Sequence, residues 1–212
     1  MIKHVTASDI QEMSKVNRLN FVNSCTGYKS ANLIGTRSEE EQTNLAIFNS
    51  FVHLGSSPAL IGFILRPLTV PRHTYENFKK TGVFTVNHVT KNMIEDAHHT
   101  SASYAETVSE FSKTTLTEEY LDGFHAPYVK ESPIKIGCSY KNEYPIIEND
   151  TLLIVAAIEH IYYDESLQAK DGWLQLDKGN VVAVNGLDGY AETKLLDRFL
   201  YARPDQETKS FE

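Results

Sequence analysis

The 212-residue sequence has few cysteines, no long apolar run and no excess of basic residues. Its two cysteines, Cys25 and Cys138, lie far apart and match no metal-binding or redox spacing. No apolar stretch approaches the roughly 20 residues that a membrane-spanning helix needs. The first residues, MIKHVTASDIQEMSK, lack the apolar core of a signal peptide. We therefore expect a reduced, cytoplasmic protein with no membrane partner.

The charge balance excludes another class of partner. The net charge is -8, from 20 basic and 28 acidic residues. A nucleic-acid-binding domain carries a basic surface instead, so we expect no nucleic-acid partner. A local pocket for one phosphate remains compatible, because such a pocket needs only one or two cations and a few backbone N–H groups.

Several catalytic motifs are also missing. The sequence has no Gly-x-Ser-x-Gly nucleophile elbow, no P-loop and no dinucleotide-binding glycine fingerprint. Any hydride donor would therefore be a nicotinamide that binds transiently. The densest histidine pair, His98-His99, is a poor metal site, because adjacent residues on a helix point in different directions. We expect no resident metal.

The pattern of apolar residues predicts a mainly β domain with added helices. The strands lie on both sides of one short helix, without regular strand–helix alternation, which favours an antiparallel barrel over a doubly wound sheet. One segment, Ile134–Lys141, alternates as a half-buried antiparallel strand does. Strands are expected over residues 31–37, 43–53, 59–65, 83–89, 134–141, 152–163 and 180–184.

Helix signals are sparser than strand signals. Thr74 is expected to cap a short helix over 75–80 that ends at Gly82. Ser103 and Thr107 each precede a glutamate by three residues, as in capping boxes.

One domain is expected to span residues 1–212. It would carry an N-terminal extension over 1–30, a final helix over 195–200 and a polar C-terminal tail over 203–212.

The most informative segment runs from Asn44 to Arg66 and continues to Arg72-His73-Thr74. Two apolar strands are joined there by a Gly-Ser-Ser-Pro connection, and a basic loop follows. A flavin nucleotide needs an apolar slot for its ring, polar groups at the ring edge, and cations with free N–H groups for its phosphate. Arginine can grip two phosphate oxygens, and a helix N-terminus favours an anion. Taken singly, these residues are equally consistent with surface arginines and a plain helix cap.

The order of motifs along the chain favours the flavin-binding interpretation over these simpler ones. From about Asn32 to Tyr190 the chain resembles the flavin reductase-like family, and within it the flavoredoxin-type branch. The matching pieces are Asn44 to Phe51 (NLAIFNSF), Pro58-Ala59-Leu60, Arg72-His73-Thr74, Gly82 to Asn87 (GVFTVN), Ala97 to Ala102 (AHHTSA) and Val108-Ser109-Glu110-Phe111.

This resemblance implies a six-stranded antiparallel split β-barrel with Greek-key order and peripheral helices. It also implies a homodimer that binds FMN near the subunit interface. The residues that it assigns are Ile47, Phe48, Asn49 and Ser50 along the ring, Arg66, Arg72, His73 and Thr74 toward the phosphate, and Asn87, Thr100, Ser101 and Ala102 near the pocket.

One departure from the family pattern leaves two functions open. Many flavin reductases of the family carry a Gly-Gly-x-Tyr-His-like element, but here Ala191 follows Tyr190. The chain is expected to be either an FMN-dependent NAD(P)H oxidoreductase, serving free flavin, oxygen or a protein acceptor, or a flavoredoxin-like electron carrier without direct NAD(P)H activity. A split barrel that binds another planar ligand, such as haem, or none, is a third reading. No catalytic side chain is assigned, because the flavin itself supplies the chemistry.

Overall fold

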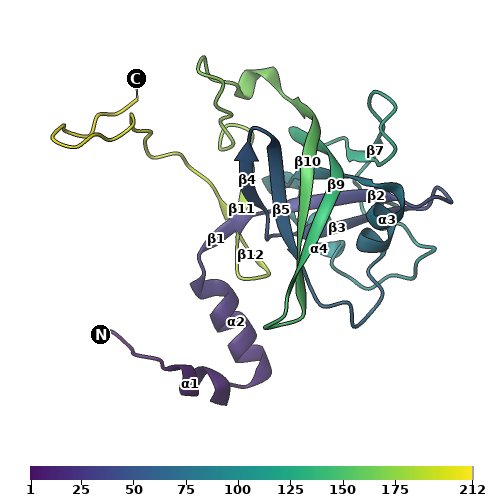
Figure 1. Ribbon diagram of the computed structural model, residues 1–212, viewed down its shortest axis with the longest axis horizontal. Coiled ribbons are helices and arrows are strands. Elements are labelled where there is room, and N and C mark those ends of the chain that lie inside the picture. Colours follow the sequence, from purple (N-terminus) through teal and green to yellow (C-terminus); the bar gives the residue numbers. More distant parts are fainter. Residues whose placement is uncertain (212) are drawn as a thin grey trace.

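The computed structural model describes residues 1–211 and is built around one seven-stranded antiparallel sheet (Figure 1). The strands lie in the order β3-β2-β6-β9-β10-β5-β4, and every neighbouring pair is antiparallel. The predicted mainly β, antiparallel class is confirmed, with seven strands in this sheet where six were expected. The strands are β2 (Asn32–Arg37), β3 (Thr43–Phe48), β4 (Val52–Ser56), β5 (Ala59–Leu65), β6 (Val83–His88), β9 (Ile134–Ile146) and β10 (Thr151–Tyr163).

Smaller elements surround this sheet. A three-stranded sheet, β1-β11-β12, is joined to the end of β6 by a hydrogen bond from the Val182 amide to the Val89 carbonyl. The remaining elements are the helices α1 (Ala7–Glu12), α2 (Lys15–Cys25), α3 (His73–Thr81) and α4 (Ile94–His99), the 3-10 helices η1 (Lys91–Met93), η2 (Glu110–Lys113) and η3 (Glu165–Leu167), and the strands β1 (Tyr28–Ser30), β7 (Glu118–Glu119), β8 (Tyr128–Val129), β11 (Val182–Asn185) and β12 (Gly189–Glu192).

Strand β2 is buried on both faces, so the sheet separates two apolar cores. Leu33 and Ile34 are adjacent in β2 and are both fully buried. Successive side chains of a strand point to opposite faces, and accordingly Leu33 packs in one core and Ile34 in the other. The Leu33 core is covered by the segment from η1 to η2 and by β11. The Ile34 core lies between the coiled sheet and α3.

An aromatic cluster fills the core on the Ile34 side. The ring of Phe63, in β5, lies 5.3 Å from that of Phe48, 5.0 Å from Phe51 and 5.7 Å from Phe84, measured between centroids. Phe78 brings α3 into the same cluster, 6.2 Å from Phe63. These contacts tie both edges of the sheet and the helix to one buried ring.

The structure corrects one strand prediction. Residues 43–53 do not form a single strand, because β3 ends at Phe48 and β4 begins at Val52. The chain breaks where the Ser50 hydroxyl accepts the Ile64 amide and donates to the Ile64 carbonyl, both at 3.1 Å. A side chain therefore replaces backbone pairing at this point. The other predicted strands are confirmed, although β9 continues five residues past Lys141 and the last one, β11, is shifted to Val182–Asn185.

The predicted helix after the basic loop exists but starts differently. Helix α3 begins at His73 with Arg72 as its N-cap residue, and no side chain caps it. Thr74 is not the cap, because its hydroxyl donates to the side chain of Asn44 instead. The predicted end is confirmed, since Gly82 forms the C-cap with φ of 77°.

Two further helix predictions are wrong. Ser103 and Thr107 do not start helices, and the glutamate after Thr107 opens the short η2 with Ser109 as N-cap. Residues 195–200 do not form a helix either. Phe199 instead pairs with Ser210 in an isolated antiparallel bridge, so the end of the chain folds back on itself.

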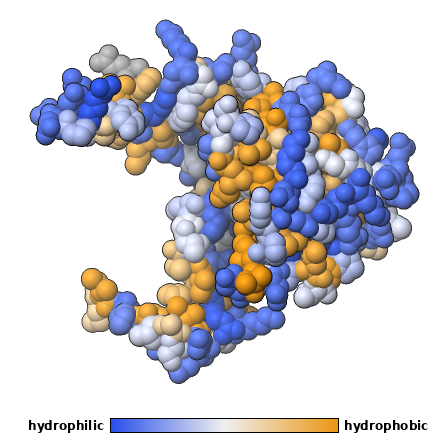
Figure 2. Space-filling model, viewed as in Figure 1, coloured by the Kyte–Doolittle hydropathy of each residue, from blue (hydrophilic) through white to orange (hydrophobic). Residues whose placement is uncertain are grey.

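Two arms extend from the same side of the sheet (Figure 1). The N-terminal arm comprises residues 1–27 and includes α1 and α2, neither of which has a buried residue. The C-terminal arm comprises residues 195–211. Figure 2 shows the molecule hollowed between the arms, with apolar side chains on both arms and along part of the wall of the hollow. Among the helices of residues 1–211, none combines the length and the apolar character needed to cross a membrane.

We expect Phe63→Ala to lower the free energy of unfolding by about 3–5 kcal/mol, because it removes a fully buried ring from the aromatic cluster. Urea denaturation followed by far-UV circular dichroism measures this change. Tyr144→Ala is the matched control, since Tyr144 is 54% exposed on the β9–β10 hairpin, and it should change stability by no more than about 0.5 kcal/mol. Equal losses in the two variants would contradict the assignment of the core.

Candidate functional site

The junction between β3 and β4 holds the four residues predicted to lie along a planar ring. Ile47 packs against the core on the Leu33 side, whereas Phe48 packs against Phe63 with its ring nearly perpendicular, at 75°. Asn49 and Ser50 follow at the break between the strands and are half-buried. The bonds from Ser50 to Ile64 fix this junction against β5. The structure therefore brings Ile47 to Ser50 together as one rigid corner.

Asn49 connects this corner to a distant part of the chain. Its amide nitrogen donates to the Gly186 carbonyl at 2.9 Å, across 137 positions of sequence. Gly186 lies in the turn between β11 and β12, so the C-terminal hairpin borders the corner. The side chain of Asn185, the last residue of β11, has a buried carbonyl oxygen with no partner within residues 1–211.

The basic loop leads to a helix start with free donors. Arg66 is exposed just after β5, and Arg72 is half-buried at the N-cap of α3. The Arg72 Nε atom is buried and has no hydrogen-bond partner among the described residues. Glu76 accepts the Arg72 amide at 3.2 Å, and no side chain caps the next N–H groups of α3. An uncapped N-terminus with a cationic side chain beside it is suited to an anion.

A chain of buried hydrogen bonds anchors the first turn of α3. Thr74 is only 6% exposed, and its hydroxyl donates to Asn44 Oδ1 at 2.7 Å. The Asn44 amide nitrogen donates to both carboxylate oxygens of Glu110, at 3.0 and 2.8 Å. The Leu45 amide donates to the same carboxylate at 2.8 Å. The helix, β3 and η2 are thereby joined through polar side chains.

The Glu110 carboxylate is held in an unusual environment, since it is 5% exposed. Burial raises its pKa above the ordinary value, while the hydrogen bonds from Leu45 and Asn44 and the nearby charge of His73 act in the opposite direction. An unpaired carboxylate in this position would be strongly destabilising. Its three N–H donors are thus required for the local fold.

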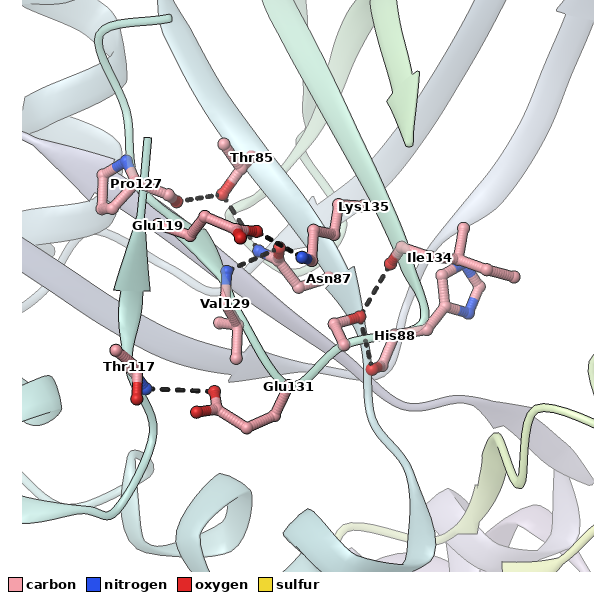
Figure 3. Close-up of polar contacts among 11 residues, drawn as sticks. Thr85, Asn87, His88, Thr117, Glu119, Pro127, Val129, Glu131, Ile134 and Lys135 are labelled. Carbon is pink, nitrogen blue, oxygen red and sulfur yellow. Dashed lines mark hydrogen bonds and ion pairs between the residues drawn. The ribbon is translucent and has the colours of Figure 1, made fainter. Parts of the chain in front are cut away.

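The four remaining predicted residues make other contacts. Asn87 is fully buried, and its amide donates to the Leu33 carbonyl and to Thr85 while its oxygen accepts the Val129 amide at 2.9 Å (Figure 3). The Thr100 hydroxyl donates to the Ala97 carbonyl. Ser101 and Ala102 are exposed after α4.

Figure 3 also shows what Asn87 does in the fold. Asn87 fixes residues 117–133 against β6, and a partly buried ion pair between Lys135 and Glu119 fixes the same segment to β9. The neighbouring His88 is half-buried, and desolvation of its ring lowers its pKa to about 4 and keeps it neutral near pH 7. A position of Asn87 in the pocket stays a prediction.

Comparison with known proteins identifies the family. Residues 28–187 match the family model described as "Flavin reductase like domain". The chain belongs to this family. It is 42% identical to a split-barrel protein from Shewanella frigidimarina NCIMB 400, described as a candidate flavin reductase, with a TM-score of 0.91 over 94% of this chain and 100% of that one.

Two more distant structures share the fold. Nitrilotriacetate monooxygenase component B from Bacillus cereus is 18% identical, with a TM-score of 0.80 over 92% of this chain and 97% of that one. Flavoredoxin from Desulfovibrio vulgaris (Miyazaki F) is 21% identical, with a TM-score of 0.69 over 84% and 91%. The flavin reductase-like assignment and the split barrel are thus both established.

The structure also shows what surrounds Tyr190, where this flavin reductase-like chain departs from the family pattern. The Tyr190 hydroxyl lies 3.2 Å from His98 Nδ1, and the two rings meet edge to face at 5.8 Å. Burial raises the pKa of Tyr190 to about 12. His99 instead contacts Tyr104 at 2.6 Å. Among residues 1–211, no three His, Cys, Asp or Glu side chains group as a metal site.

Sequence reasoning missed three residues that build this site. The roles of Asn44 and Glu110 were not foreseen, although both lie within motifs that carry the family resemblance. Gly186 was not foreseen either, because its carbonyl meets Asn49 only in the folded chain. The sequence signal that could have revealed this site is the side-chain amide of Asn44 at the start of an apolar strand, because a buried amide needs a hydrogen-bond partner.

We expect Asn44→Ala to lower the free energy of unfolding by about 2–3 kcal/mol, because it removes two of the donors to a buried carboxylate. Asn77→Ala is the matched control, since Asn77 makes one partly buried bond to the neutral Thr36 hydroxyl and should cost about 1 kcal/mol. Chemical denaturation at pH 7 compares them. A smaller loss for Asn44→Ala than for Asn77→Ala would contradict the anchoring role.

Proposed function

We propose that this flavin reductase-like chain is an FMN-binding oxidoreductase that passes electrons from NAD(P)H through FMN to an acceptor. The observation that carries the proposal is the start of α3. Within residues 1–211, the buried Nε atom of the N-cap residue Arg72 has no hydrogen-bond partner, and no side chain caps the first helix N–H groups. Membership of the family supports the binding of a flavin. The start of α3 supports a site for the phosphate group, which FMN has and riboflavin lacks.

The phosphate would be held by Arg66, Arg72, His73 and the first turn of α3 around Thr74. Arg72 offers a planar guanidinium fork, and the helix offers oriented N–H groups together with the positive end of its dipole. The long loop before the helix leaves Arg66 exposed and able to approach from the other side.

The ring would lie along Ile47, Phe48, Asn49 and Ser50. Backbone groups at the strand break and the polar side chains at its rim can meet the polar edge of a planar ligand, while the adjoining aromatic cluster keeps the corner rigid. Asn87, Thr100, Ser101 and Ala102 stay in the proposal as residues near the pocket. When bound, FMN accepts hydride and passes electrons onward, and the chain contributes position and exclusion of water.

A second function has its own supporting observation. Ala191 follows Tyr190, so the chain lacks the histidine that many flavin reductases of the family carry at that point. His98 meets the Tyr190 hydroxyl from α4 instead. This difference, with the shared flavoredoxin fold, supports an FMN electron carrier without direct NAD(P)H activity, serving a protein acceptor.

The two arms support the proposal of a homodimer. Large apolar side chains remain exposed on both arms, and burying them in a partner would be favourable. The N-terminal arm exposes Val16, Leu19, Phe21 and Val22, and the C-terminal arm exposes Leu196, Phe199, Leu200 and Tyr201. The hollow between the arms (Figure 2) is open to a second copy of the chain.

Absorption spectroscopy tests the flavin proposal. We expect the protein to bind FMN, and NADH or NADPH to bleach the bound flavin without oxygen. A yellow protein that neither NADH nor NADPH bleaches would exclude the oxidoreductase and support the electron carrier. Failure to take up FMN would contradict both proposed functions. Arg72→Ala should raise the Kd for FMN by about tenfold or more, the cost of one charge-assisted phosphate contact. Lys80→Ala, at the other end of α3, should leave this Kd unchanged.

Light scattering after size exclusion tests the dimer. We expect a mass of twice the 23.9 kDa of one chain. A Leu196→Ser, Tyr201→Ser double variant should shift the protein toward the monomer, because these side chains are 92% and 91% exposed on the C-terminal arm. The control is Tyr144→Ser with Ile147→Ser, on the exposed β9–β10 hairpin. A monomeric native protein would refute the dimer.

A further inference from the structure

We infer that Glu110 is a positioning residue for the phosphate-binding turn of α3, and that it acts through Asn44 and Thr74. This inference rests on the proposed FMN function and deepens it. None of the resemblances assigns a role to Glu110. The inference is carried by the direction of the buried hydrogen-bond chain that joins the three side chains.

The direction of the chain is set at its Glu110 end. Both carboxylate oxygens of Glu110 accept the Asn44 amide nitrogen, and one of them also accepts the Leu45 amide, so the nitrogen of Asn44 faces Glu110. The Asn44 Oδ1 atom then has to point the other way, where it accepts the Thr74 hydroxyl at 2.7 Å. Each side chain in the series has one possible orientation.

This direction decides what Thr74 offers to a ligand. Its hydroxyl proton is committed to Asn44 inside the protein, and its side chain is buried. A phosphate at the start of α3 therefore meets backbone N–H groups and the side chains of Arg72 and His73, with no donor from the Thr74 hydroxyl. The contribution of Thr74 is to hold the first turn in place, so that its N–H groups point outward.

The same chain fixes the helix against the sheet. Asn44 and Leu45 belong to β3, Glu110 opens η2, and Thr74 lies in α3, so one carboxylate holds three elements that are 30 to 66 residues apart in sequence. Glutamine at position 110 would bring N–H donors as well as an acceptor. The Asn44 amide could then turn over, and Thr74 would lose its fixed acceptor.

A neighbouring glutamate provides a matched comparison. Glu118 accepts hydrogen bonds from the Thr43 hydroxyl at 2.7 Å and from Tyr120 at 3.0 Å. It therefore ties Thr43, the residue of β3 next to Asn44, to β7. Its bonds do not lead to α3, so it shares the local structural role of Glu110 without the connection to the helix.

The test compares FMN with riboflavin, which has the same ring and no phosphate, by fluorescence titration of wild type, Glu110→Gln and Glu118→Gln. We expect Glu110→Gln to raise the Kd for FMN by about tenfold, as the loss of one well-placed hydrogen bond to a charged group does. The Kd for riboflavin should stay within about twofold, and Glu118→Gln should change neither. If Glu110→Gln weakens the binding of FMN and riboflavin equally, or weakens neither, the positioning role is overturned.

The wild type separates this inference from the function on which it rests. A wild type that binds neither flavin, or binds both equally, refutes the proposed phosphate site and this inference with it. A wild type that prefers FMN, combined with an unchanged preference in Glu110→Gln, refutes the inference alone.

A second variant covers the case in which Glu110→Gln fails to fold. Thr74→Val keeps the shape and the backbone N–H while removing the hydroxyl at the far end of the chain. Like Glu110→Gln, Thr74→Val should raise the Kd for FMN and leave the Kd for riboflavin nearly unchanged. An unchanged Kd for FMN would overturn the inference. Where both variants fold, the Glu110→Gln, Thr74→Val double variant should lose no more FMN affinity than either single variant. Additive losses of FMN affinity would show instead that the Thr74 hydroxyl contacts the phosphate itself.

Discussion

The requirement to bury the ring of Phe63 shapes the rest of this molecule. Phe63 lies in β5 near one edge of the sheet, while Phe48 ends β3 at the other edge. Their rings can meet at 5.3 Å only if the sheet coils so that its two edges approach one another. The coiling places the break between β3 and β4 at the rim of the core. The same cluster draws in α3 through Phe78, and the helix start comes to lie beside the end of the basic loop.

Polar contacts complete what the apolar cluster begins. Apolar contacts are not directional, so they hold α3 near the sheet without fixing which way its first turn faces. The buried carboxylate of Glu110 and the amide of Asn44 supply the direction, at the cost of desolvating a charge. The opposite end of the helix is held differently, by Lys79 against Glu143 and Tyr140 on β9. The helix is thus fixed at both ends, and its free N–H groups remain at the end next to Arg72.

The reaction of a split-barrel protein depends on local features around the shared fold. The same fold occurs in a nitrilotriacetate monooxygenase component and in a flavoredoxin, so the fold alone does not decide the function. What distinguishes this chain is local: Ala191 after Tyr190, His98 against the Tyr190 hydroxyl, and two arms that leave large apolar side chains exposed. These features bear on the proposed electron donor, acceptor and homodimer.

The sequence by itself determined the antiparallel class, most strand positions, the end of α3 at Gly82 and the family. These follow from local signals, namely alternation of apolar residues, turn glycines and the order of motifs. Only the tertiary structure decided that residues 43–53 break at Ser50, that Thr74 donates to Asn44 instead of capping the helix, and that residues 195–200 form no helix. In the first two cases a side chain found a partner on another element, at Ile64 in β5 or at Asn44 in β3. Local patterns carry no information about such partners, because they become neighbours only when the β4–β5 hairpin forms, in the case of Ile64, or when α3 packs against the sheet, in the case of Asn44.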